Sequence, residues 1–152
     1  MLLPGPWAPW LSVLDEDGYD SVVLSRAEEA VDAVVASGRR PVLLGHGAGA
    51  RSAYAQNGRL RLAAVVALAP TRGWRRPGTI RRRVPLLLVS GGRDRVAGER
   101  HVAALARRDR SRFPESVTDH QIFPGRDHDL AFGAGWRDVA GFCLDWLARQ
   151  NL

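Results

Sequence analysis

The chain has 152 residues, 45% of them hydrophobic, which suits a single domain with a buried core. One cysteine excludes an internal disulfide framework, no His/Cys cluster has zinc-ligand spacing, and no apolar run approaches the roughly 20 residues that span a bilayer. The net charge is +6, and all 22 basic residues are arginines. From these features we expect one soluble, cytoplasmic domain over residues 1–152, with no metal or other cofactor and no membrane contact.

Short apolar runs alternate along the chain with helical patterns, which predicts a mostly parallel sheet with helices on both faces. The runs expected to be strands are residues 20–24, 41–44, 62–70, 84–90 and 120–123. The expected helices are residues 25–37, 48–57, 99–108 and a closing helix around 139–147, the first of them starting with the capping box Ser25–Glu28. With about six strands in all, the predicted fold is α/β, a three-layer αβα sandwich.

The stretch PVLLGHGAGARSAY combines an apolar strand, a glycine-rich turn and a helix start, and two chemistries use that arrangement. Read as Gly45-x-Gly47-x-x-Ala50, it is a loop that brings a dinucleotide pyrophosphate to a helix N-terminus. That function needs an acidic residue at the end of the following strand, where this chain offers only Arg72 for a 2′-phosphate. Read as Gly45-x-Gly47-x-Gly49, it is a nucleophile elbow with glycine at its centre.

The nucleophile elbow requires an acid after a later strand and a histidine after the last strand. Asp94 in SGGRDRV and His128 in FPGRDHDL occupy those places. With these three motifs in order, the chain resembles the α/β-hydrolase superfamily over nearly its whole length, especially its small, lidless members of the dienelactone-hydrolase type. The resemblance implies that Asp94 orients His128 and that Gly47 stands where the family has its serine nucleophile.

Several departures from the family pattern concern chemistry. Gly47 has no side chain, so no acyl-enzyme can form, although glycine suits the positive φ of an elbow. The resemblance places one oxyanion-hole donor on the N–H of Ala48 and the other on Pro6, which has none, or on Trp7 if the alignment shifts by one. His46, before the elbow residue, is expected to pack or to line the site. The family's two opening strands would precede Met1, so the site is expected to be open or completed by another subunit of a homo-oligomer.

Two functions stay open. A His128 oriented by Asp94 can act as a general base toward water or beside a carbonyl, which makes the protein a small-molecule enzyme. Alternatively, the pair is a structural relic in a pseudo-enzyme that binds a ligand or a protein. The arginine-rich loop 72–83 is either a solvated loop or a docking surface for an anionic or carrier-linked compound, and we do not expect it to bind nucleic acid, since only Trp74 is interleaved with its arginines.

Overall fold

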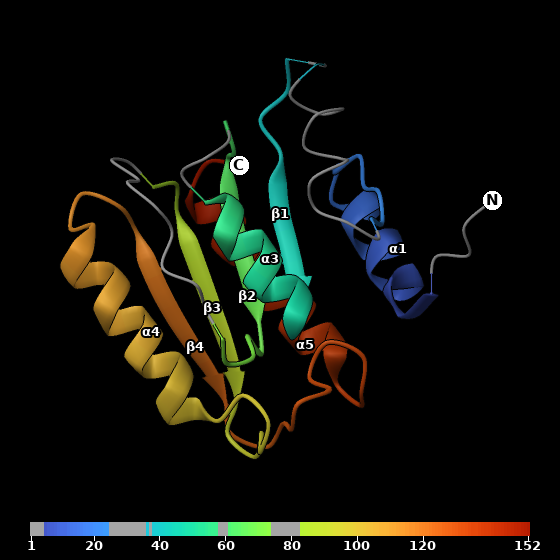
Figure 1. Cartoon of the computed structure of the whole chain (residues 1–152). Coiled ribbons are helices and arrows are strands. Elements are labelled where there is room, and N and C mark those ends of the chain that lie inside the picture. The colour runs from blue at the N-terminus through green and yellow to red at the C-terminus, as the bar shows by residue number, and fades with distance from the viewer. Residues whose placement is uncertain (1–4, 25–35, 37, 58–60, 74–82) are drawn as a thin grey trace.

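A four-stranded parallel sheet forms the centre of the molecule, in the order β1-β2-β3-β4 (Figure 1). The computed structural model describes residues 5–24, 36, 38–57, 61–73 and 83–152. The strands are β1 (Val42–His46), β2 (Ala64–Leu68), β3 (Leu86–Gly91) and β4 (Thr118–Phe123). Their parallel register pairs Leu44 with Val66 and Val66 with Leu87. All four carboxyl ends therefore lie at one edge of the sheet.

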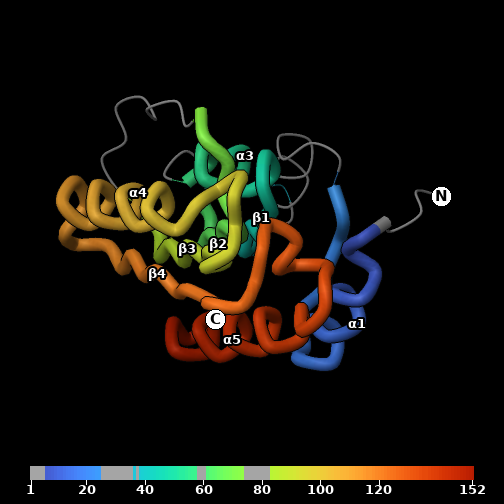
Figure 2. Tube along the Cα trace, turned by 90° about the horizontal axis from the view of Figure 1, so that it is seen from below, coloured from blue at the N-terminus to red at the C-terminus, as the bar shows by residue number. Residues whose placement is uncertain are grey.

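Helices cover both faces of this sheet. They are α1 (Ala8–Glu16), which follows the short 3-10 turn η1 (Gly5–Trp7), and α3 (Ala48–Gln56), α4 (Glu99–Arg112) and α5 (Trp136–Arg149). Figure 2 shows α3 and α4 on one side of the strands and α1 and α5 on the other, so the three-layer arrangement predicted from the sequence is confirmed. None of the described helices is long and apolar enough to cross a membrane.

Alternation along the strands divides the core into two clusters. Ala64, Val66 and Leu68 of β2 face α5 and the Trp10 side chain of α1. Val65 and Ala67, the residues between them, face α3 and α4. Every residue of β2 and β3 is buried, as expected for central strands of a parallel sheet with both faces covered.

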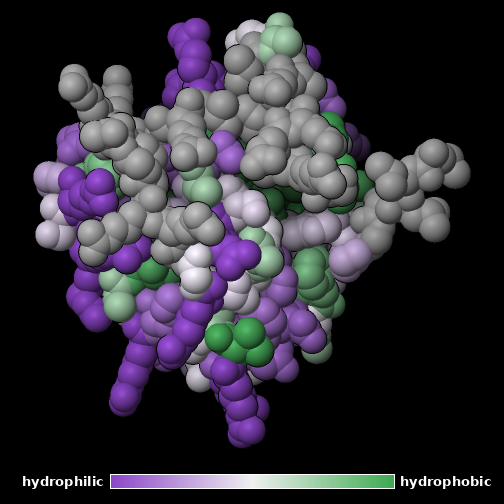
Figure 3. Space-filling view, in the orientation of Figure 1, coloured by the Kyte–Doolittle hydropathy of each residue, from purple (hydrophilic) through white to green (hydrophobic). Residues whose placement is uncertain are grey.

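The surface over α4 is strongly basic. Five exposed arginines lie on this helix: Arg100, Arg107, Arg108, Arg110 and Arg112. Figure 3 shows hydrophilic side chains gathered over this part of the molecule. Arg110 and Arg112 lie in the last turn of α4, where their positive charges also complement the helix dipole.

The strand predicted at residues 20–24 is not formed. The segment pairs with no strand of the described sheet, and Val22 is 62% exposed. Its contacts are at its start, where Asp20 pairs with Arg39 at 2.9 Å and the preceding residue, Tyr19, donates from Oη to the Leu152 carbonyl. An apolar run alone cannot create a strand without a neighbouring edge to pair with.

The prediction of about six strands is likewise not met among the described residues, which contain four. Pro6 and Trp7, which the resemblance places at the oxyanion hole, lie in a 3-10 turn that leads into α1, with a proline near the start of the helix. Residues 2–4, the helix expected at 25–37 except for residue 36, and residues 74–82 of the arginine-rich loop lie outside the described residues. The other predicted strands and helices are formed, with bounds shifted by a few residues.

Candidate active site

The elbow between β1 and α3 is built from glycines for two separate reasons. Gly47 has φ 55° and ψ −115°, a backbone conformation that residues with a Cβ rarely adopt. Gly45 is required by close approach, since a Cβ there would lie 2.5 Å from the carbonyl carbon of Gly49. The strand can therefore turn sharply into the helix and present residue 47 at the carboxyl edge of the sheet.

Asp94 and His128 meet at this edge, from the loops that follow β3 and β4. His128 Nδ1 lies 2.9 Å from Asp94 Oδ2. Because a carboxylate only accepts, Nδ1 carries the hydrogen and Nε2 is the free basic nitrogen of the neutral ring. Asp94 Oδ1 in turn accepts from the N–H groups of Val96 and Ala97, both at 2.7 Å. The Asp94 side chain is fully buried, whereas that of His128 is 25% exposed. Asp94 is therefore enclosed by the protein, and part of the His128 ring is accessible to solvent.

His128 Nε2 faces Gly47. A Cβ atom on Gly47 would lie 3.5 Å from His128 Nε2 and 3.9 Å from the Thr71 methyl carbon. An oxygen atom bonded to such a carbon, or brought there by another molecule, would lie within hydrogen-bonding reach of Nε2. A small side chain at position 47 would therefore stand beside an oriented base.

The two predicted oxyanion donors differ in their surroundings. Ala48 is the first residue of α3, so its N–H has no acceptor within the helix and lies at the positive end of the helix dipole. Pro6 is exposed in η1 and has no N–H to donate. Trp7 packs edge-on against Phe132, with ring centroids 4.9 Å apart. The described contacts of Trp7 thus connect it to the site through Phe132.

His46 contacts the base directly. Its Nε2 lies 2.7 Å from the carbonyl oxygen of His128, and the two imidazole centroids are 4.9 Å apart. Phe132 covers the His46 ring at 5.1 Å. Burial lowers the pKa of His46, which favours the neutral ring.

Close backbone contacts bring together the acid loop (residues 92–98, after β3) and the histidine loop (residues 124–135, after β4). Cβ atoms on Gly91 and Gly92 would lie 2.4 Å from the Arg126 carbonyl oxygen and 2.7 Å from that of Pro124. The N–H of Arg93 donates to the Arg126 carbonyl at 2.8 Å. From the other side, Trp10 Nε1 of α1 donates to the Ala131 carbonyl at 2.7 Å. These contacts determine where His128 stands relative to Asp94.

Sequence reasoning missed Thr71, Phe132 and the pair Gly91–Gly92 as parts of this site. The glycine pair was the one available signal, because two consecutive glycines directly after a buried strand indicate a close backbone approach. The contacts of Thr71 and Phe132 depend on how loops pack, and no local pattern marks them.

Three other side chains with nucleophilic groups, Ser52, Ser90 and Cys143, lie within helices or strands. Ser90 is fully buried in β3, where its hydroxyl lies 2.8 Å from His120 Nε2. Ser52 donates to the Ala48 carbonyl one turn back in α3. Cys143 is buried on α5, and burial raises its pKa to about 12. Burial shields Ser90 and Cys143 from solvent, and the exposed Ser52 hydroxyl is bound to its own helix.

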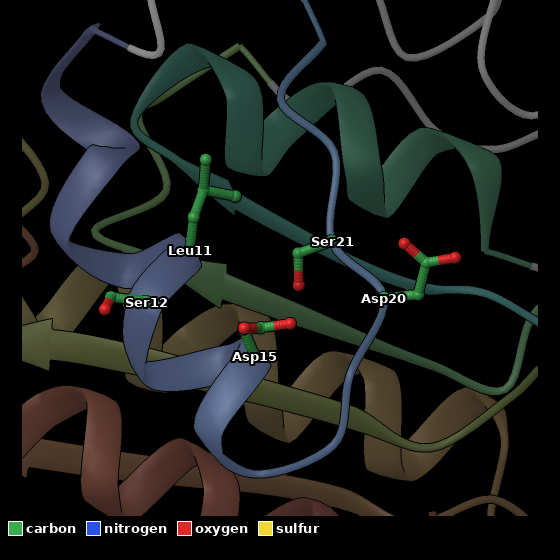
Figure 4. A pocket seen from close by; sticks show the side chains of 5 residues that line it. All are labelled: Leu11, Ser12, Asp15, Asp20 and Ser21. Carbon is green, nitrogen blue, oxygen red and sulfur yellow. The ribbon is translucent and has the colours of Figure 1, made fainter.

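A hollow of about 290 Å³ lies away from the His128–Asp94 pair (Figure 4). Its walls are formed by α1 and by the segment that follows it: Leu11, Ser12, Asp15, Asp20 and Ser21. No set of three His, Cys, Asp or Glu side chains that could hold a metal ion occurs in the part of the chain that the structure describes.

Solved structures of similar shape have the α/β-hydrolase fold, whereas no protein-family model and no curated protein matches the chain. An Agrobacterium tumefaciens protein of unknown function, proposed to be an alpha/beta hydrolase, superimposes with a TM-score of 0.76 at 17% identity, over 96% of this chain and 77% of its own. The monoacylglycerol lipase of Paleococcus ferrophilus gives 0.67 at 14% identity, over 96% and 90%. The esterase domain of a Rhodothermus marinus protein gives 0.67 at 18%, over 98% and 81%. At these identities the likeness concerns the fold, and the chain has the α/β-hydrolase fold.

Proposed function

We propose that the protein is a small-molecule enzyme in which His128, oriented by Asp94, acts as a general base without a covalent intermediate. The observation that carries this proposal is the direction of the His128 ring. Nδ1 is bound to the Asp94 carboxylate at 2.9 Å, and Nε2 faces Gly47, which has no side chain. Because Gly47 cannot attack a substrate, the reacting atom has to come from a water molecule or from the substrate itself.

In the proposed reaction a proton moves to His128 Nε2. It leaves either a water molecule, whose oxygen attacks a carbonyl carbon, or a carbon beside a substrate carbonyl, whose electron pair shifts into an enolate. Asp94 stabilises the resulting imidazolium, and the Ala48 N–H stabilises the negative oxygen that forms. The imidazolium then returns its proton to the leaving group or to another carbon, which restores the neutral base.

We expect the substrate to be an anionic or carrier-linked acyl or carbonyl compound. Arg51 and Arg72 are both exposed, and Arg51 Nη1 lies 3.4 Å from the Arg72 carbonyl, directly after Thr71. Thr71 borders the space beside Gly47. The Arg51 guanidinium at this position, together with the charge of the exposed Arg72, would attract a carboxylate or phosphate on the substrate.

A second candidate function is binding without catalysis, as a pseudo-enzyme. Pro6 favours it, because a proline at the second oxyanion position leaves Ala48 as the single backbone donor of the pair implied by the resemblance. In that case His128 and Asp94 only join their two loops, and the space beside Gly47 receives a ligand, a protein partner or a second copy of the chain.

The experiment compares the wild type with His128→Ala and Asp94→Asn on p-nitrophenyl esters, lactones and carbonyl compounds with acidic C–H groups. Hydrolysis is followed by absorbance, and C–H exchange is followed by NMR in D2O. Loss of the base is expected to lower turnover about 10²- to 10⁴-fold. The matched control is Asp129→Ala, an exposed neighbour of His128 whose carboxylate makes no hydrogen bond to any residue that the structure describes, and this variant should leave turnover unchanged. Turnover that survives in His128→Ala would exclude the proposed enzyme.

A further inference from the structure

We infer that His46 is a positioning residue whose ring holds the main chain of His128 and thereby aims the base at Gly47. The significance of this hold for catalysis rests on the proposed function, whereas the hold itself does not. The inference concerns a single hydrogen bond, from His46 Nε2 to the His128 carbonyl oxygen at 2.7 Å.

The direction of this hydrogen bond follows from its acceptor. A carbonyl oxygen has no hydrogen, so His46 Nε2 has to donate, and the neutral ring has to be the Nε2–H tautomer with a bare Nδ1. A neutral ring with its hydrogen on Nδ1 could not make this bond. His46 is half-buried between the His128 and Phe132 rings, which limits rotation to another partner.

The position of His46 in the chain makes the hold effective. His46 is the last residue of β1, and one peptide bond separates it from Gly47. The residue that binds the His128 carbonyl is therefore the neighbour of the residue that His128 faces. His46 ends a strand paired along its length with β2, and the Gly47 N–H donates to the Leu68 carbonyl of β2 at 2.9 Å. A shift of the histidine loop relative to the elbow would have to break this bond first.

His128 is consequently held at two points. Asp94 binds its ring at Nδ1, and His46 binds its carbonyl oxygen. With only the first point, the ring can pivot about its bond to Asp94 while the loop moves. With both, Nε2 keeps its direction toward Gly47, which is what a general base needs before a substrate arrives.

The first test needs no variant and no substrate. Nitrogen-15 NMR at neutral pH reports which ring nitrogen of each of the four histidines carries hydrogen. We expect a hydrogen on His46 Nε2. A neutral His46 with its hydrogen on Nδ1 would overturn the inference, because that tautomer cannot donate to the carbonyl.

The second test separates donation from packing. His46→Gln keeps a donor at a comparable distance from the backbone, and His46→Phe keeps an aromatic ring but has no donor. We expect amide exchange at residues 127–131 to be about fivefold faster in His46→Phe than in His46→Gln, with unchanged exchange in β2 and β3. Equal exchange rates in the two variants would contradict the inference. If His46→Phe does not fold, the nitrogen-15 NMR measurement of the His46 tautomer is the deciding test.

These outcomes are independent of the proposed function. If His128→Ala leaves turnover unchanged while the tautomer and exchange results are as expected, the positioning role holds and the enzyme proposal fails. Where turnover is measurable, His46→Phe should lower kcat with KM little changed, and His46→Gln should restore much of the loss.

Discussion

Gly47 determines which reactions the site can perform. Its conformation, φ 55° with ψ −115°, is the one in which a side chain would point at His128 Nε2. With a hydrogen in place of that side chain, the backbone is unstrained and residue 47 itself offers the base no nucleophile. Under the proposed function, the same residue therefore stabilises the elbow and leaves the attacking atom to water or to the substrate.

The Gly47→Ser variant should acquire His128-dependent hydrolysis of p-nitrophenyl esters. Its Cβ would lie 3.5 Å from His128 Nε2, which lets the hydroxyl hydrogen-bond to the base. The positive φ should cost about 1–3 kcal/mol, and the melting temperature should fall by several degrees. Release of p-nitrophenol and a thermal melt measure the two effects.

Gly49→Ser is the matched control for this change. A Cβ there meets no atom within 4 Å and requires no positive φ, so the variant should hydrolyse these esters no faster than the wild type and be nearly as stable. A folded Gly47→Ser protein without ester hydrolysis would mean that the oxyanion donors or the substrate walls are also lost, which favours the binding function.

At the scale of elements, the loops after β3 and β4 assemble the acid and the base through their backbones. Gly91 and Gly92 let the histidine loop pass close to the end of β3, and the Arg93 N–H then donates to the Arg126 carbonyl. Asp94, two residues after the crossing, reaches His128, two residues after Arg126. The spacing of the pair is thus a consequence of where the two loops touch.

Gly91→Ala should separate these loops. A Cβ at this position would lie 2.4 Å from the Arg126 carbonyl oxygen, a backbone atom that can move only with its loop. We expect a loss of about 1–3 kcal/mol in the free energy of unfolding, measured by urea denaturation. Gly125→Ala, in the same loop but with no atom within 4 Å of the added carbon, should be nearly neutral. Equal stability of the two variants would refute the crossing as the organising contact.

Sequence reasoning predicted the elements that have a strong local signal. Apolar runs predicted the strands β1 to β4, and helical spacing predicted the helices α3, α4 and α5. The ends of the strands then indicated where Gly47, Asp94 and His128 would meet. The strand at residues 20–24 was wrong because pairing depends on a neighbouring edge, which is not a local property. The contacts of Phe132 and Thr71 were missed for the same reason.

For the whole molecule, a buried polar cluster joins α3, α4 and β4. Tyr54 Oη donates to Asp109 Oδ1 at 2.5 Å, and Thr118 donates to the other carboxylate oxygen. The Arg83 guanidinium lies between the Tyr54 and Phe113 rings, 4.4 and 4.5 Å from their centroids, with Nε 3.6 Å from Asp109. Global stability therefore depends on the charge states of this cluster.

Stability should fall in alkaline solution partly because of Tyr54. Burial, and then the nearby Asp109 carboxylate, raise the pKa of Tyr54 to about 12, whereas a tyrosine in the unfolded chain ionises near pH 10. The unfolded state therefore loses its proton first, so this contribution is complete below pH 10 and declines as the pH rises toward 12.

Urea denaturation at pH 9 and pH 11 measures this decline. Tyr54→Phe should be less stable than the wild type at pH 9, and the difference should shrink at pH 11 by roughly 1 kcal/mol. Tyr19, whose pKa is also raised, contributes equally to both proteins and cancels in the comparison. A stability difference that stays constant between the two pH values would contradict the assignment.

The histidine loop is held by its main chain: the carbonyl oxygens of Arg126, His128 and Ala131 accept hydrogen bonds from Arg93, His46 and Trp10. The side chains of other loop residues, such as Pro124 and Asp129, are exposed to solvent and make no hydrogen bond within the described part of the chain. Substitutions at these exposed positions can alter the rim around the base while its placement persists. A library randomised there would be a practical starting point for directing the scaffold toward new ligands, because most of its members should keep the native fold.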